Sequence, residues 1–204
     1  MEIACLDLEG VLIPEVWIGV AEKTGIDDLR ATTRDIPDYD ALMRQRLAIL
    51  EDNKLGIGII QDVIGEMEPL DGAPEFLDWL RTNFQVLILS DTFYEFAEPL
   101  MRKLGWPALF CHHLEIAGDG RLTDYRLRMD DHKCEAVRAI RALNFKTIAA
   151  GDSYNDTNML AAADCGILFR APANVIAEFP GFPVTNTFDE LKTEFQVARK
   201  KFQD

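Results

Sequence analysis

Short runs of apolar residues recur along the chain at wide intervals, and each ends in polar residues or a turn. The runs lie in the segments Ile3–Gly10, Val86–Thr92, Thr147–Ser153 and Cys165–Phe169. Uninterrupted apolar runs of this length are typical of strands that are buried on both faces of a parallel sheet.

Apolar residues at helical spacing fill much of the chain between these runs. Such patterns cover Pro74–Thr82, Phe93–Leu104, Asp130–Leu143 and Thr187–Phe202. We expect Asp130 or Asp131 to occupy the N-cap of the third helix. Strands that alternate with helices predict an α/β fold with a doubly wound, Rossmann-like parallel sheet.

One pair of segments has the pattern of a β-hairpin. Leu109–Ile116 and Arg121–Arg128 flank the turn sequence Gly118–Gly120, and glycine is the residue that tight hairpin turns favour. We expect this hairpin to protrude from the sheet.

Roughly seventy residues separate the first two strands, far more than one crossover helix needs. The segment Glu15–Met67 has no convincing strand and reads as several helices broken near Gly25, Pro37 and Gly56. An insertion of this kind predicts a small helical cap over the sheet. We therefore expect an α/β catalytic core at residues 1–14 and 69–204 and a helical cap at residues 15–68.

Composition narrows the class of protein. The 204 residues are 48% hydrophobic, which suits one domain or one domain with an insertion. The formal net charge of −14 disfavours nucleic acid and anionic lipid as partners. No run approaches the ~18 apolar residues that a membrane helix needs. The start, Met1–Ala4, lacks the basic region of a secretory signal, and the four cysteines are too widely spaced for a disulfide framework or a zinc site. These features predict a cytoplasmic protein with reduced thiols.

Acidic residues gather where the predicted strands end. Asp7 and Glu9 follow the first strand, Ser90 and Asp91 the second, and Asp152 and Asp156 the third. Ligand sites of open α/β sheets form at the carboxyl ends of the strands. Carboxylates crowded at such an edge need a positive charge, and a hard cation such as Mg²⁺ fits carboxylate oxygens together with a substrate phosphate.

Four motifs in order give a resemblance to a known family. Asp7–Leu12 reads DLEGVL, Ser90 follows an apolar strand, Lys133 lies near the start of a helix, and Gly151–Asp156 reads GDSYND. Together they resemble the four motifs of the haloacid-dehalogenase superfamily of aspartyl phosphotransferases. The resemblance covers nearly the whole chain.

A narrower resemblance is to the phosphoserine phosphatase branch of that superfamily. This branch has a small helical cap between the first two motifs, a Glu shortly after the first motif, matched by Glu15, and a cap-helix Arg, matched by Arg46. The segments Ser90–Phe96 and Gly151–Asp156 look most like the bifunctional members, which also pass the phosphoryl group from phosphoserine to homoserine.

Two positions depart from the commoner members of this branch. Glu9 stands where an Asp is usual, and Asp91 and Thr92 stand where glycines usually follow the second-motif Ser. Both departures match the bifunctional subgroup. The resemblance thus implies an enzyme of serine and threonine biosynthesis with small-molecule substrates, phosphoserine and homoserine.

The resemblance also implies roles for the motif residues. Asp7 would be the nucleophile, and Mg²⁺ would bind Asp7, the backbone carbonyl of Glu9 and Asp152, with Asp156 in the second layer of contacts. Glu9 would be the general acid and base.

The remaining predicted residues would bind the substrate. Ser90 and Lys133 would hold the phosphoryl group as well as support catalysis. Arg46 would bind the substrate carboxylate and Glu15 its ammonium group, although Arg46 lies in or beside the apolar stripe of its helix and could equally snorkel at the cap edge. Asp91 and Asn155 complete the predicted substrate-binding set.

Two other functions stay open from sequence. One is a phosphatase of the same fold that acts on another small phosphomonoester, such as a sugar or cofactor phosphate. The other is a catalytically silent module that binds a partner through its cap. The sequence leaves the oligomeric state open, a homodimer included.

The three histidines show no metal-binding pattern. His112 and His113 are adjacent in the predicted hairpin, and neighbouring residues of a strand point to opposite faces. We expect surface or packing roles for them and for His132.

Overall fold

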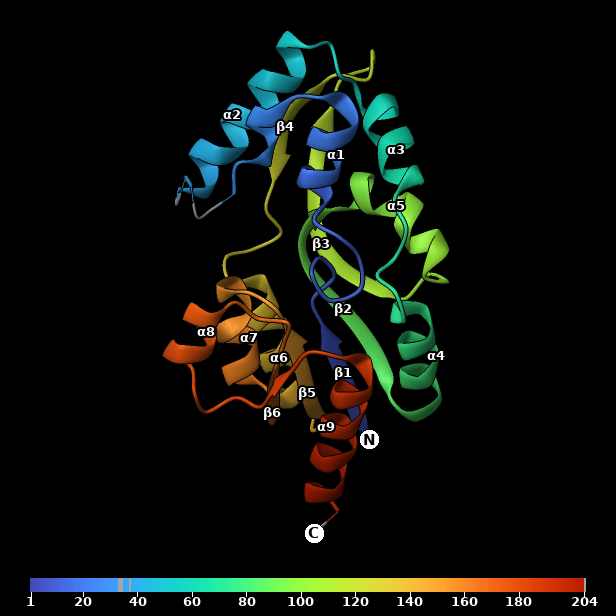
Figure 1. The fold of residues 1–204 in the computed structure, drawn as a ribbon, viewed down its shortest axis with the longest axis vertical. Coiled ribbons are helices and arrows are strands. Elements are labelled where there is room, and N and C mark those ends of the chain that lie inside the picture. The colour runs from blue at the N-terminus through green and yellow to red at the C-terminus, as the bar shows by residue number, and fades with distance from the viewer. Residues whose placement is uncertain (33–34, 37, 204) are drawn as a thin grey trace.

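The computed structural model describes residues 1–32, 35–36 and 38–203, and a single seven-stranded sheet forms its centre (Figure 1). The strands are β1 Glu2–Leu6, β2 Gln85–Phe93, β3 Ala108–Ile116, β4 Leu122–Arg126, β5 Lys146–Gly151, β6 Cys165–Phe169 and β7 Val184–Thr185. Their order in the sheet is β4-β3-β2-β1-β5-β6-β7, and every neighbouring pair is parallel except β3 with β4. The predicted α/β sheet and the predicted hairpin are confirmed.

The helices that flank the sheet begin and end close to their predicted positions. They are α4 Ala73–Asn83, α5 Tyr94–Lys103, α6 His132–Ala142 and α9 Phe188–Lys201, together with the short α7 Thr157–Ala162 and α8 Ala173–Glu178, which the pattern did not predict. Asp131 is the N-cap residue of α6, but its carboxylate accepts from Asn158 instead of capping the helix. No helix in the described stretches has both the length and the apolarity to cross a membrane.

Alternate strand residues enter two separate hydrophobic layers, which explains the uninterrupted apolar runs. Ala4 and Leu6 of β1 belong to the layer formed with α4 and α9, whereas Cys5 belongs to the layer formed with α6, α7 and α8. Both faces of the sheet are therefore covered, and the carboxyl ends of its strands are left to form a site.

The segment between β1 and β2 is helical in its described part. It contains α1 Val16–Thr24, the short helix η1 Asp27–Arg30, α2 Tyr39–Asp52 and α3 Ile57–Glu66. Gly25 ends α1 in a left-handed conformation (φ 71°) and Gly56 precedes α3, so two of the predicted breaks are confirmed, while Pro37 lies outside the described residues. These inserted helices lie beyond the carboxyl end of β1 (Figure 1). The assignment of residues 15–68 as a separate cap domain stays a prediction.

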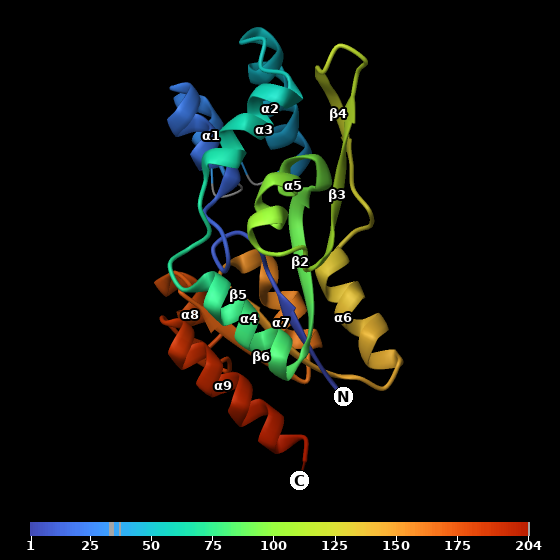
Figure 2. The same cartoon turned by 90° about the vertical axis from the view of Figure 1, so that its right-hand side faces the viewer.

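The hairpin of β3 and β4 extends beyond the other strands of the sheet and runs beside α2 (Figure 2). Arg44 of α2 pairs with Asp124 of β4 at 2.8 Å, and the Tyr125 hydroxyl donates to Asp40 at 2.6 Å. The Ile57 N–H at the start of α3 donates to the carbonyl oxygen of Gly120 in the hairpin turn at 2.8 Å. The hairpin therefore supports the helix that carries Arg46.

Candidate active site

A cleft of about 600 Å³ lies between the carboxyl ends of the central strands and the inserted helices. All the residues that the sequence predicted for the site line this cleft except Asp156, which is fully buried behind it. The lining members of that set are Asp7, Glu9, Glu15, Arg46, Ser90, Asp91, Lys133, Asp152 and Asn155.

Asp7 occupies the centre of the cleft floor, directly after β1. Its backbone N–H donates to the carbonyl oxygen of Ala150 in β5 at 2.9 Å, which fixes the main chain where the strand ends. Its Oδ1 atom accepts from the Leu8 N–H at 2.8 Å and from Lys133 Nζ at 2.9 Å. The carboxylate is therefore nearly buried yet held in one orientation.

Lys133 is a buried cation at the start of α6. Its Nζ atom lies 2.8 Å from Asp156 Oδ1, 2.9 Å from Asp7 Oδ1 and 3.1 Å from Asp91 Oδ2. Burial opposes its charge, but the carboxylates of Asp156, Asp7 and Asp91 together hold the pKa of the Lys133 ammonium well above its usual range. Lys133 is thus a permanent positive charge on the cleft floor.

Asp156 organises the loop after β5. Its Oδ2 atom accepts from the backbone N–H groups of Asp152 at 3.0 Å and Ser153 at 3.1 Å, and from the Ser153 hydroxyl at 3.2 Å. Its other oxygen accepts from Lys133. Both oxygens of Asp156 are engaged, so this side chain orients the loop that presents Asp152.

Asp152 is a half-buried carboxylate in the cleft. Burial, together with the nearby carboxylates of Asp156 and Glu15, raises its pKa to about 7. The backbone of Gly10, in a left-handed conformation (φ +75°), passes so close that a Cβ atom there would lie 2.4 Å from Asp152 Oδ2. Glycine at this position lets the first motif approach the fourth.

The carboxylates of this floor fit a divalent cation. Ligand atoms of Asp7, Asp152 and Asp156 lie within 4.8 Å of one another. Burial and then the carboxylate of Asp156 hold the pKa of Asp7 well above its usual range, because Lys133 alone does not balance the surrounding acids. Oxygen ligands and an excess of negative charge suit a hard divalent cation, and Asp7 and Asp152 are side chains that could hold one.

Glu9 links the cleft floor to the first inserted helix. Its Oε2 atom accepts from the Val16 N–H at the start of α1 at 2.9 Å. Burial and then the neighbouring Glu15 carboxylate raise the pKa of Glu9 to about 8. A carboxyl group in this state can carry a proton at neutral pH and release it during a reaction.

Ser90 and Asp91 reach the cleft through an irregularity in β2. The register of β2 against β3 shifts between Leu89 and Phe93, and Ser90 and Asp91 lie within that interval. The Ser90 hydroxyl oxygen accepts from the Thr92 N–H at 3.2 Å, which fixes the oxygen and leaves the hydroxyl proton for a ligand. The strand continues through Asp91 and Thr92 to Phe93 instead of ending at the polar residues.

Arg46 lies in the part of the cleft formed by α1 and α2, and only 7% of its surface is exposed. Its guanidinium carbon lies 4.4 Å from the centroid of the Trp17 ring, and Nη2 donates to the carbonyl oxygen of Ala31 at 2.9 Å. Its buried Nε atom has no hydrogen-bond partner among the described residues. Burial lowers the pKa of Arg46 to about 10, and the 7% exposure of the whole residue is small for a side chain that snorkels into solvent.

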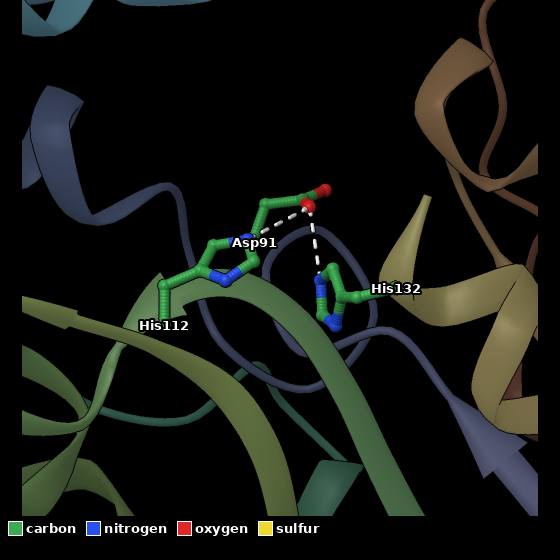
Figure 3. Close-up of side chains that lie close together, drawn as sticks. All are labelled: Asp91, His112 and His132. Carbon is green, nitrogen blue, oxygen red and sulfur yellow. Dashed lines mark hydrogen bonds and ion pairs between the residues drawn. The ribbon is translucent and has the colours of Figure 1, made fainter. Parts of the chain in front are cut away.

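A second group of side chains joins this site, and sequence reasoning missed it. His132 Nε2 lies 3.1 Å from Asp91 Oδ1, and His112 Nε2 lies 3.7 Å from the same oxygen (Figure 3). His112 and His113 point to opposite faces as predicted, since His113 instead contacts Glu95. The only sequence signal was that His132 precedes Lys133, and the approach of His112 depends on the tertiary fold.

Comparison with known proteins shows which family this chain resembles. A family model for haloacid dehalogenase-like hydrolases matches residues 1–164. The chain is 62% identical over 201 residues to phosphoserine phosphatase ThrH of Pseudomonas aeruginosa, covering 98% of both chains. It is 63% identical over 201 residues to a phosphoserine phosphatase of Pseudomonas syringae pv. tomato, covering 98% of this chain and 85% of the relative.

The fold has counterparts among solved structures. The crystal structure of a phosphoserine phosphatase in its apo form superposes with a TM-score of 0.73 and 24% identity. The superposition covers 90% of this chain and 92% of the other. This similarity shows that the two proteins share a fold.

Proposed function

This chain belongs to the haloacid dehalogenase-like hydrolase family, and on that basis we propose that it is a Mg²⁺-dependent phosphoserine phosphatase that also transfers the phosphoryl group to homoserine. Arg46 carries the choice of substrate. It is a buried cation whose Nε donor has no partner among the described residues, in the same cleft as Asp7 and Lys133. An amino-acid phosphate ester supplies both a carboxylate for Arg46 and a phosphoryl group for the cleft floor.

In the first step, an oxygen of Asp7 attacks phosphorus and forms an aspartyl-phosphate. The bond between phosphorus and the serine oxygen breaks, and that oxygen takes the proton of Glu9. The raised pKa of Glu9, about 8, supports this role because the proton is present at neutral pH. The Ser90 hydroxyl donates to a phosphoryl oxygen, and the Lys133 ammonium supplies a fixed positive charge beside the phosphoryl group while negative charge moves from Asp7 to the leaving oxygen.

In the second step, water or the homoserine hydroxyl gives a proton to the Glu9 carboxylate and attacks phosphorus. The bond to Asp7 breaks, which restores its carboxylate and releases either phosphate or phosphohomoserine. Because Glu9 both donates and accepts the proton, its charge is the same at the beginning and the end of the cycle.

Asp7, Asp152 and the backbone carbonyl of Glu9 would hold Mg²⁺, with Asp156 orienting the Asp152 loop from behind. When bound, the ion supplies the positive charge that lets the Asp7 anion approach a phosphate dianion. The crowding of carboxylates around a single lysine supports this assignment.

The amino-acid part of the substrate would lie under the inserted helices. Arg46 would bind its carboxylate through planar N–H donors, and Glu15, which lines the same cleft, would pair with its ammonium group. Asp91 and Asn155 line the cleft as well and would complete the binding site.

The test incubates the full chain with Mg²⁺, phosphoserine and homoserine and follows phosphate and phosphohomoserine by mass spectrometry. We expect both products, and neither from the Asp7→Asn variant. Phosphate without phosphohomoserine would refute the transfer, and release of phosphate from sugar phosphates but not from phosphoserine would favour a different phosphomonoester. No release from any ester would indicate a silent binding module.

The proposal also covers the location of the enzyme, its pathway and the role of the inserted helices. We place the enzyme in the cytoplasm, in serine and threonine biosynthesis, with small molecules as its partners. The inserted helices would act as a cap domain at residues 15–68 that excludes water during the first step. The names of the Pseudomonas relatives support the place in amino-acid biosynthesis, and the side chains of α1 and α2 that line the cleft support the cap.

A further inference from the structure

We propose that His112 and His132 are positioning residues that hold the Asp91 carboxylate, and that Asp91 in turn fixes the Lys133 ammonium beside Asp7. This inference rests on the proposed function in one respect, since it gives Lys133 a part in catalysis. The geometry of the histidines does not depend on which phosphate ester is the substrate.

Asp91 completes the surroundings of the Lys133 ammonium. An ammonium group has three N–H donors, and three carboxylates lie within 3.1 Å of Nζ. Asp7 and Asp156 come from the loops that follow β1 and β5, whereas Asp91 approaches from β2. Without the third carboxylate, the ammonium would be held from two directions only and could turn away from Asp7.

Arg128 determines which nitrogen of each histidine carries the proton. The backbone N–H of Arg128 donates to His112 Nδ1 at 3.1 Å, so this nitrogen must have a free lone pair. Nη2 of the same arginine lies 3.3 Å from His132 Nδ1, and a guanidinium can only donate. Each neutral ring therefore has its proton on Nε2, the nitrogen that faces Asp91 Oδ1 (Figure 3).

The electrostatics agree with a neutral His132 ring beside an anionic Asp91. Burial lowers the pKa of His132, so its ring remains uncharged at neutral pH. Burial works against the charge of Asp91, but Lys133 and then the two histidines hold its pKa well below the usual range. Asp91 is thus an anion whose Oδ1 atom accepts from His132, with the His112 ring 3.7 Å away, and whose Oδ2 atom pairs with Lys133.

A metal ion bound by Asp91, His112 and His132 is the competing interpretation, because their ligand atoms lie within 4.8 Å of one another. The hydrogen bonds from Arg128 argue against it, since they leave protons on the two Nε2 atoms that would have to bind the ion. Two cations, Arg128 and Lys133, also border the group. The observations therefore favour a hydrogen-bonded support for Lys133.

Nitrogen NMR of the full chain tests the protonation directly and without turnover. The chain has three histidines, so single substitutions assign every ring. Long-range ¹⁵N–¹H spectra should show protonated Nε2 and unprotonated Nδ1 for His112 and His132. Protons on Nδ1 would overturn the proposal, and a shift of the Nε2 signals on addition of Zn²⁺ would establish the metal interpretation instead.

Kinetics test whether the histidines act through Asp91. A displacement of about 1 Å in a catalytic group can cost on the order of 10²-fold in rate, so His132→Leu should lower kcat for phosphoserine by about that factor and leave KM within about threefold. His132→Gln, which keeps an N–H donor near the position of Nε2, should recover most of kcat. His113→Leu, a neighbouring histidine that contacts Glu95 instead, is the matched control and should have wild-type kinetics.

A double-mutant cycle completes the test. If His132 acts only through Asp91, adding His132→Leu to an Asp91→Ala variant should lower kcat no further. Independent, multiplying losses would refute the proposal, as would a Gln variant as slow as the Leu variant. An inactive wild-type protein would instead count against the proposed function, and the NMR result would still decide the arrangement of the histidines.

Discussion

Replacing Arg46 with methionine tests the amino-acid end of the cleft. Methionine keeps an unbranched apolar stem against the Trp17 ring but removes the guanidinium and its planar donors. The variant should therefore fold, with some loss of stability from the missing cation–π contact and from the bond to the Ala31 carbonyl oxygen.

The expected size of the effect follows from burial. Only 7% of Arg46 is exposed, so a substrate carboxylate bound there makes hydrogen bonds to a charged group away from bulk water. Hydrogen bonds to charged groups contribute about 1.5–3 kcal/mol, which corresponds to about 10- to 150-fold in kcat/KM. Because Arg46 contacts the part of the substrate that does not react, the loss should appear in KM with kcat nearly unchanged.

The assay compares two substrates and two variants. Phosphoethanolamine keeps the ammonium and phosphate groups of phosphoserine but lacks the carboxylate, so its KM should change less than about threefold in Arg46→Met. Arg44→Met is the matched control, since Arg44 lies on the same helix, is half exposed and pairs with Asp40 and Asp124. Surface pairs of this kind contribute only about 0–1 kcal/mol, so Arg44→Met should retain wild-type KM for both esters. An equal rise of KM for both esters in Arg46→Met would refute the carboxylate-binding role.

Three further results are expected. Asp7→Asn should abolish turnover and the hydroxylamine-sensitive phosphoenzyme. It should nevertheless raise the Tm of the metal-free protein, because it removes a carboxylate that is costly to bury: burial and the Asp156 carboxylate hold the pKa of Asp7 well above its usual range. A lower Tm would contradict this reasoning. In EDTA, Tm should fall as the pH rises from about 5 to about 8. The pKa of Glu9 is about 8 against an ordinary 4.5, and that of Asp152 is about 7 against an ordinary 3.8. In this range the folded protein keeps protons that the unfolded chain releases, so raising the pH favours unfolding. Mg²⁺ should flatten this dependence, and a Tm that rises with pH in EDTA would show that the two acids are not buried as described. Gly10→Ala should increase the Mg²⁺ concentration needed for half-maximal activity, because the new Cβ atom would lie 2.4 Å from Asp152 Oδ2. Gly25→Ala is the control, since Gly25 has a similar φ but open space around it, and it should cost only about 1 kcal/mol of stability.

The strands of the sheet could be predicted because their burial leaves a pattern in consecutive residues. Each buried strand has to place residues such as Ala4 and Cys5 in opposite hydrophobic layers, and this requirement produces an unbroken apolar run in the sequence. The two-residue strand β7 and the six-residue helices α7 and α8 are too short to show a period, so the pattern did not reveal them.

Part of the candidate site could be predicted from the sequence, and part depends on tertiary packing. Asp7 and Asp152 could be paired from sequence, because strand ends of a parallel sheet meet at one edge. The contact of Lys133 with Asp91, and of Asp91 with His112 and His132, joins residues from β2, β3 and α6. No spacing along the chain encodes that meeting, since it depends on how the hairpin and α6 pack against the register shift in β2.

The hairpin contacts have a mechanical consequence for entry into the cleft. The inserted helices are joined to the sheet by the two chain segments that enter and leave them, and also by β3 and β4, through Arg44 with Asp124 and Ile57 with Gly120. Because the hairpin adds to these two segments and to the packing of α3 on α5, the helices cannot swing about a single hinge axis without breaking those contacts or bending both strands. The stiffness of β3 and β4 should therefore limit how far the cleft opens and how quickly substrate is exchanged.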